Sequence, residues 1–103
     1  MKTYSTLYEG DIKALQIVIR DQDDRPWNPS YAETEIVSAG TIVDSARRCL
    51  IRNNAISQFI NGIVTNNPGT YEIIWKLNKY VILDRKLKKY TYYHKTELII
   101  EEK

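Results

Sequence analysis

The segment from Asn66 to Leu77 constrains the fold of this chain more than any other. Its first four residues, Asn-Asn-Pro-Gly, predict a turn, because Pro presets φ while Asn and Gly accept turn conformations. The residues that follow alternate between apolar and other side chains, which is the pattern of a half-buried β-strand. This strand places one face in the core: Tyr71, Ile73, Trp75 and Leu77.

The start of this strand also predicts a particular way of leaving the turn. Gly69-x-Tyr71 at the head of a buried strand is typical of a tyrosine corner, in which the Tyr hydroxyl bonds to backbone upstream. Immunoglobulin-like domains usually carry a Cys two residues after that Tyr, and Ile73 takes its place here. We therefore predict that Gly69, Tyr71 and Trp75 form a structural corner.

Length and composition predict a single soluble domain. The chain has 103 residues, enough for one modest core, and its 43% hydrophobic and 27% charged residues are ordinary for a globular protein. We expect one domain over 1–103, with residues 1–10 as an N-terminal segment that forms an extra strand or an arm. No apolar run reaches the roughly 18 residues that span a bilayer, and no signal peptide is recognisable. We expect synthesis in a cytoplasm and no membrane partner.

The chemistry-bearing residues are too few for an active site. Cys49 is the only cysteine and His94 the only histidine, so a disulfide, a cysteine-based metal site and a histidine metal site are all excluded within the chain. We expect Cys49 to be a small core residue. The sequence also lacks a glycine-rich phosphate loop. We predict no catalytic residue, no cofactor and no enzyme activity.

Turn signals recur about every ten residues, which predicts an all-β fold, an immunoglobulin-like antiparallel β-sandwich of about seven strands. In one segment a helix is the alternative: apolar residues within 45–61 recur at helical spacing, with Asp44 as N-cap and Gly62 as stop. Asn53-Asn54 in its middle argues against that helix. The predicted strands are 12–20, 32–43 as one or two strands, 48–52, 56–60, 70–77 and 90–101, with a turn at 44–46 and a basic connection at 78–89.

Two segments, one in a predicted loop and one leading into a predicted strand, suggest binding sites. Asp21, Asp23 and Asp24 suggest calcium, but an EF-type loop would need a ligand at Arg25, a Gly at Pro26 and a Glu at Ala32. A looser calcium site and a solvated turn both stay open.

The basic and tyrosine-rich run 85–95 is the candidate interface. Lys and Arg neutralise phosphates and Tyr rings stack on unpaired bases, so single-stranded nucleic acid is one partner to consider. Alternation gives another interpretation, in which Tyr90, Tyr92 and His94 are partly core and the remaining charges protect an edge strand. A net charge of +2 falls short of a nucleic-acid footprint. The candidate interface residues are Lys86, Lys88, Lys89, Tyr93 and Lys95.

Several short motifs follow one another along the chain: Asp11-Ile12-Lys13, Asp23-Asp24-Arg25-Pro26, Glu35-Ile36-Val37, Ile42-Val43-Asp44-Ser45, Pro68-Gly69-Thr70-Tyr71, Tyr93-His94-Lys95-Thr96 and Leu98-Ile99-Ile100-Glu101. In this order they resemble the immunoglobulin-like domains of phage tail and baseplate proteins, of the baseplate upper protein N-terminal type. The resemblance covers roughly residues 11–102. The chain departs from the family pattern where Asp24-Arg25 replaces the usual Gly, and in a longer basic insertion over 83–89.

The resemblance implies a non-enzymatic structural role in a virion. Its partners would then be other phage structural proteins, with this chain present as a homo-oligomer in the particle. The last strand, 90–101, is the predicted edge for such packing. The alternative is a small β domain that binds single-stranded nucleic acid through the run 85–95, and salt dependence would separate the two.

Overall fold

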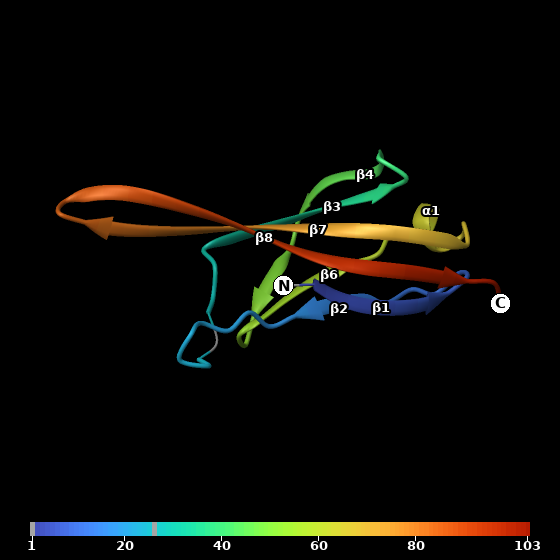
Figure 1. The fold of residues 1–103 in the computed structure, drawn as a ribbon, viewed down its shortest axis with the longest axis horizontal. Coiled ribbons are helices and arrows are strands. Elements are labelled where there is room, and N and C mark those ends of the chain that lie inside the picture. The colour runs from blue at the N-terminus through green and yellow to red at the C-terminus, as the bar shows by residue number, and fades with distance from the viewer. Residues whose placement is uncertain (1, 26) are drawn as a thin grey trace.

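The computed structural model describes residues 2–25 and 27–103 of the chain, which form eight strands and one short helix (Figure 1). The prediction of an all-β fold is confirmed. The elements are β1 (Lys2–Tyr8), β2 (Ala14–Ile17), β3 (Tyr31–Ser38), β4 (Thr41–Arg48), β5 (Leu50–Arg52), β6 (Ala55–Phe59), α1 (Gly62–Thr65), β7 (Gly69–Leu83) and β8 (Lys86–Glu101).

The strands form two sheets. The larger has the order β1-β8-β7-β3-β4, and the smaller has the order β2-β6-β5. All pairs are antiparallel except β1 with β8, which run parallel from Lys2 opposite Lys95 to Tyr8 opposite Glu101. The prediction of a purely antiparallel architecture was therefore wrong at the N-terminal segment, which is an edge strand of a mixed sheet.

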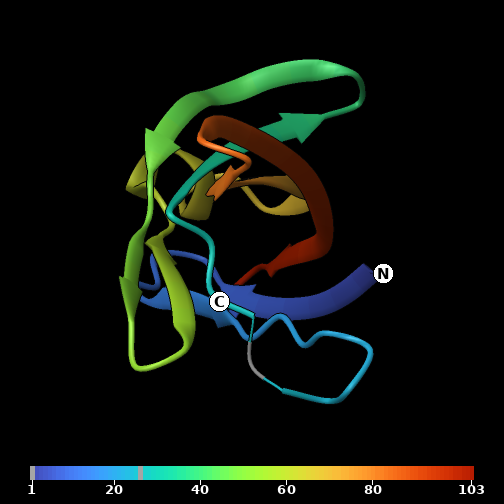
Figure 2. The same cartoon turned by 90° about the vertical axis from the view of Figure 1, so that its left-hand side faces the viewer.

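The core lies between the two sheets, which wrap around it when the molecule is viewed along its length (Figure 2). Alternation decides which side chains enter it: in β7 the residues at every second position from Tyr71 to Leu77 are buried. The smaller sheet contributes Ile17 and Ile56 from the opposite side. Trp75 and Ile73 are completely buried, as the period-two pattern predicts.

The segment 45–61 contains strands, so the helical alternative was wrong. The predicted turn at 44–46 was also wrong, because these residues continue β4 past an irregularity in its pairing with β3. Asn53 and Asn54 have φ of 51° and 65°, the left-handed pair that closes a two-residue hairpin between β5 and β6. The helix α1 begins three residues after β6 ends and is capped by Asn61, whose side-chain oxygen accepts from the Ile63 N–H at 2.9 Å.

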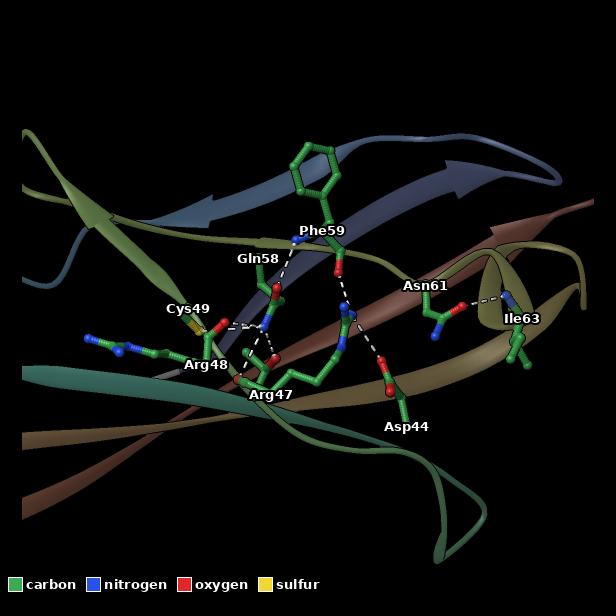
Figure 3. A network of polar contacts seen from close by, with 9 residues as sticks. Asp44, Arg47, Arg48, Cys49, Gln58, Phe59, Asn61 and Ile63 are labelled. Atoms are coloured by element: carbon green, nitrogen blue, oxygen red, sulfur yellow. Dashed lines mark hydrogen bonds and ion pairs between the residues drawn. The ribbon is translucent and has the colours of Figure 1, made fainter.

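The chain passes from one sheet to the other at Cys49, between β4 and β5. Figure 3 shows the polar network at this crossing, centred on the buried amide of Gln58. Its Nε2 donates to the carbonyls of Arg47 and Arg48, each at 3.1 Å, and to the Thr34 hydroxyl at 3.0 Å. A side chain of the small sheet thereby donates hydrogen bonds to the backbone carbonyls at the end of β4, where the chain leaves the large sheet.

The hairpin of β7 and β8 is much longer than predicted. The segment 78–89 was expected to be a basic connection, but both strands continue through it to a two-residue turn at Asp84 and Arg85, with φ of 51° and 64°. The prediction that 90–101 is an edge strand was wrong for its second half, because β8 lies between β1 and β7 from Lys95 onward.

Among the described residues, no helix is long and apolar enough to cross a membrane.

Candidate functional site: the hairpin arm

The distal part of the β7–β8 hairpin projects from the body of the molecule, and we call residues 79–92 the arm (Figure 1). Asn78 is the last residue of β7 that pairs with β3, opposite Tyr31. Beyond it, β7 and β8 pair only with each other in the described part of the chain, and every residue from 82 to 93 is exposed. Five further residues of β7 at about 3.4 Å each extend the arm by about 17 Å.

The arm has two faces of different origin. The core-side face continues the side of β7 and β8 that is buried in the body, and the outer face continues the opposite side. The outer face carries the pair Ile82 and Leu87, directly opposite each other and 75% and 69% exposed. The core-side face carries Lys79, Val81, Leu83, Lys86, Lys88, Tyr90 and Tyr92.

The arm is strongly basic. Arg85, Lys86, Lys88 and Lys89 cluster at its tip and in β8, Lys79 lies at its base, and Asp84 is its one acidic residue. These five basic residues and one acidic residue give the arm a net charge of +4 on a thin projection.

The outer face of the large sheet provides the contrast. There Lys95 lies 3.7 Å from Glu72, and Lys76 lies 3.9 Å from Glu33. Lys95 was predicted with the interface residues, but it belongs to this neutralised surface, whereas Lys86, Lys88, Lys89 and Tyr93 are exposed on or beside the arm. The sequence run 85–95 thus divides between two environments.

The base of the arm is held by the loop that follows β2. The Trp27 ring meets the Tyr92 ring edge-on, with centroids 5.2 Å apart. Lys79 Nζ lies 5.5 Å from the centre of the Trp27 ring and donates to the Asn28 carbonyl at 2.6 Å. Tyr92 is nevertheless 52% exposed and Tyr90 40%, so the prediction that both are partly core was wrong.

A notch of about 530 Å³ lies between this loop and the base of the arm. Its wall is mostly apolar and aromatic, and the buried His94 lies at its edge beside Tyr92. The loop adds acidic and amide groups to the rim. The lining residues are Val18, Ile19, Arg20, Asp21, Gln22, Trp27, Tyr92, Tyr93 and His94.

The loop itself is ordered by its own acidic residues. Asp21 Oδ1 accepts from the backbone N–H groups of Asp23 and Arg25 at 2.9 and 3.0 Å, and Asp24 Oδ1 lies 3.8 Å from Arg20 Nε. Across residues 2–25 and 27–103, no three His, Cys, Asp or Glu side chains are grouped so that they could hold a metal ion. The structure thus gives Asp21, Asp23 and Asp24 the geometry of a self-bonded turn, and the calcium hypothesis finds no ligand set.

At the other end of the hairpin the Tyr71 hydroxyl donates to the Asn67 carbonyl at 2.5 Å, four residues upstream. This is the contact expected of a tyrosine corner. Gly69, between the two, has φ of 153°, a conformation that side chains rarely adopt. The turn and strand are thus joined by a side chain whose ring lies in the core.

A chain of hydrogen bonds crosses from β7 through β8 to β1 in the body of the molecule. Trp75 Nε1 donates to Thr96 Oγ1 at 2.9 Å, Thr96 lies 2.7 Å from Thr3, and Thr3 lies 3.1 Å from His94 Nε2. The Trp75 indole can only donate. If Thr96 then donates to Thr3 and Thr3 donates to Nε2 of His94, both hydroxyl protons are used and Nε2 is the acceptor at the end of the chain. Desolvation by burial lowers the pKa of His94, which favours this neutral form.

Cys49 is buried where the chain changes sheets, and burial raises the pKa of its thiol to about 11. A thiol held protonated in this way is a poor nucleophile. Its position agrees with the prediction of a core residue.

Sequence reasoning missed the apolar outer face of the arm and the notch at its base. A signal for the longer first strand was present, because Tyr80-Val81-Ile82-Leu83 is a continuous apolar run. The notch had no local signal, since loop and hairpin lie more than 60 residues apart. Neither a scan against protein-family models nor a search of curated proteins finds a match for this sequence.

Proposed function

We propose that this chain is a non-enzymatic structural module of a phage particle, a tail or baseplate component, that attaches to other particle proteins through its arm. The observation that carries the proposal is the arm, a two-stranded projection with every residue from 82 to 93 exposed. The resemblance of the whole chain to baseplate domains supports the choice of particle.

Exposed aliphatic side chains at the end of a projection favour a protein partner. A two-stranded hairpin is only marginally stable alone in water, so it gains from a surface that covers it. Burying a side chain such as Ile82 or Leu87 stabilises a complex by about 1.5 to 3 kcal/mol. Because these two lie opposite each other, one hydrophobic pocket on a partner would cover both.

The same proposal includes a finer description of the fold as a variant of the immunoglobulin-like sandwich. Its support is the pair of facing sheets and the Tyr71 contact with Asn67. The parallel strand β1 would be an addition to that plan.

A second candidate function is nucleic-acid binding, and the charge of the arm favours it. A two-stranded β-ribbon fits the major groove of DNA, and exposed tyrosines stack on unpaired bases. The lysines and Arg85 would neutralise phosphates. This candidate leaves the exposed Ile82 and Leu87 without a role, which is why we place it second.

The test is incorporation into particles. Tail lysates or purified virions should contain the chain by mass spectrometry, and the double variant Ile82→Ser, Leu87→Ser should be depleted from particles while remaining folded in solution. The matched control changes charge on the same arm, Lys86→Gln with Lys89→Gln, and should be incorporated. Absence of the wild-type chain from particles, together with tight binding to single-stranded nucleic acid that weakens steeply with salt, would overturn the proposal in favour of the second candidate.

A further inference from the structure

The arm has one free edge in β8, the edge that faces away from β7. In the body β1 occupies this edge, beginning with Lys2 opposite Lys95. Figure 1 shows β1 beside β8 in the body, while the arm extends beyond it. In the described part of the chain, residues 86–93 of β8 pair only with β7. Every second residue of 86–93 therefore presents its backbone N–H and C=O to the free edge without a strand partner.

The notch lies beside the inner end of this edge, just beyond the start of β1. Tyr92 lines it from β8, and Val18 and Ile19 line it from the segment that follows β2. β1 shows how a strand on this edge directs its side chains, because Leu7 enters the core at 4% exposed while Tyr8 turns outward at 50%. A strand that continues the line of β1 along the arm would in the same way point alternate side chains toward the notch.

The charge along the edge changes from tip to base. Near the tip, three lysines lie within residues 86–89 of β8, in an arm whose net charge is +4. At the base, the three aspartates of the loop are offset by the basic side chains of Arg20, Arg25 and Lys79. The notch therefore offers mainly its apolar wall. Lysines along an open edge disfavour pairing with a second copy of the same edge and favour an acidic strand.

We propose that the edge of β8 over 86–93 binds an extended segment of a partner protein, which adds a third strand to the arm. The segment runs parallel to β8, as β1 does, with acidic side chains beside the lysines and an apolar side chain in the notch. This mode of recognition takes affinity from main-chain hydrogen bonds and specificity from pockets for alternate side chains. It rests on the proposed function and deepens it, because it names the contact by which the arm attaches to a particle protein.

A third strand would also stabilise the arm. A two-stranded hairpin is marginally stable in water, whereas three strands with an apolar face are stable. In the body β8 is flanked on both edges, and among the described residues the arm is the part of β8 that lacks one flank. Nucleic acid would neutralise the lysines, but it lacks the alternating N–H and C=O groups that match a strand edge.

Peptides that differ only in backbone methylation test this mode of binding. The parent probe is a blocked, fluorescent eight-residue peptide, Glu-Thr-Glu-Thr-Val-Thr-Leu-Thr, and anisotropy measures its binding to the full chain. We expect a dissociation constant of about 0.1 mM or tighter, and slowed hydrogen exchange at every second amide of 86–93 by nuclear magnetic resonance. N-methylation of the four threonines blocks one edge of the peptide, and N-methylation of the other four residues blocks the opposite edge. One methylated peptide should bind like the parent, and the other about tenfold or more weakly.

Variants of the chain locate the binding site. Val18→Asp places a charge in the notch and should weaken binding of the parent peptide about tenfold or more. The matched control is Val43→Asp, the same change at a similarly exposed position of β4, which should leave binding unchanged. The double variant Ile82→Ser, Leu87→Ser alters the outer face alone and should also bind the peptide like the wild type.

No binding of the parent peptide at about 1 mM overturns the inference. Equal affinities of the two methylated peptides also overturn it, because charge and side chains alone would then hold them. So does an equal effect of Val18→Asp and Val43→Asp. The peptide assay uses the isolated chain, so its failure refutes strand addition alone, while absence of the chain from particles refutes the proposed function.

Discussion

The two halves of the β7–β8 hairpin share their strands, their register and their alternation, yet they differ in almost every physical respect. In the proximal half Trp75 and Leu98 are completely buried, whereas in the distal half Ile82 is 75% exposed. The register between the strands is continuous from Gly69 opposite Ile100 to Leu83 opposite Lys86. Local strand structure is therefore the same in both halves, and the neighbours make the difference.

The proximal half has neighbours on both edges and on one face. β3 and β1 flank it, and the small sheet covers its inner side. The distal half has its neighbours at the base, where Trp27 meets Tyr92 and the Tyr80 N–H donates to the Ser30 hydroxyl at 3.2 Å. The proximal half therefore holds the domain together, while the exposed distal half is available for binding. Five measurements test this division.

The largest effect is expected at Trp75. Trp75→Ala removes a fully buried ring and its bond to Thr96, so the free energy of unfolding should fall by about 3 to 5 kcal/mol in urea denaturation. The matched variant in the arm, Tyr90→Ala, should change it by less than about 1 kcal/mol. Equal effects would show that the arm belongs to the core in solution.

The next effect concerns the link between the sheets. Gln58→Ala leaves the carbonyls of Arg47 and Arg48 and the Thr34 hydroxyl without their donor, and should lower the free energy of unfolding by about 1 to 3 kcal/mol. Gln16, exposed on β2, supplies the control. A loss at Gln58 no larger than at Gln16 would mean that water replaces the amide.

Tyr71→Phe tests the corner with a single atom. The ring stays in the core and only the bond to the Asn67 carbonyl is lost, so we expect a decrease of about 1 to 2 kcal/mol with an unchanged circular dichroism spectrum. Tyr93→Phe, at an exposed position, should be neutral. An unchanged midpoint for Tyr71→Phe would show that its hydroxyl reaches water.

A smaller effect on the free energy of unfolding is expected from the protonation of His94 as the pH changes. Burial lowers the pKa of His94 in the folded state below the value of about 6.5 that applies to the unfolded chain. The unfolded chain therefore binds the proton more readily, so stability is fully present above about pH 6.5 and falls as the pH drops toward the lowered pKa. Denaturation midpoints of the wild type and His94→Gln should converge as the pH falls from about 7.5 to about 5.5, a range that brackets the pKa of histidine in the unfolded chain. A difference between the two midpoints that stays constant over this range would contradict the lowered pKa of His94.

The smallest effect on stability should come from shortening the arm. Replacing residues 81–88 with Asn-Gly retains Tyr80 opposite Lys89 beside a two-residue turn. We expect the free energy of unfolding to change by less than about 1 kcal/mol, because the removed residues are almost all exposed. The shortened chain should nevertheless lose its place in particles, and a large loss of stability would erase the distinction between the two halves.

Much of the local structure could be predicted from the sequence. Alternation at Tyr71, Ile73 and Trp75 identified the central strand and its buried face, because a period of two is a property of neighbouring residues. Errors arose where the same pattern has two interpretations. In 78–89 the basic residues suggested a loop, although the apolar run 80–83 favours a strand and the two-residue turn at Asp84 and Arg85 lets both strands continue.

From the sequence alone follow the central strand with its buried face, the position of the Asn-Pro-Gly turn, and the presence of a single cysteine and a single histidine. The tertiary structure is needed to show that β1 pairs in parallel with β8, that Gln58 bridges the sheets, and that residues 82–93 stay exposed. The physical reason is the range of the interactions. Strand alternation depends on adjacent residues. In contrast, the whole chain decides which strands from opposite ends of the sequence pair and how far one sheet covers the other.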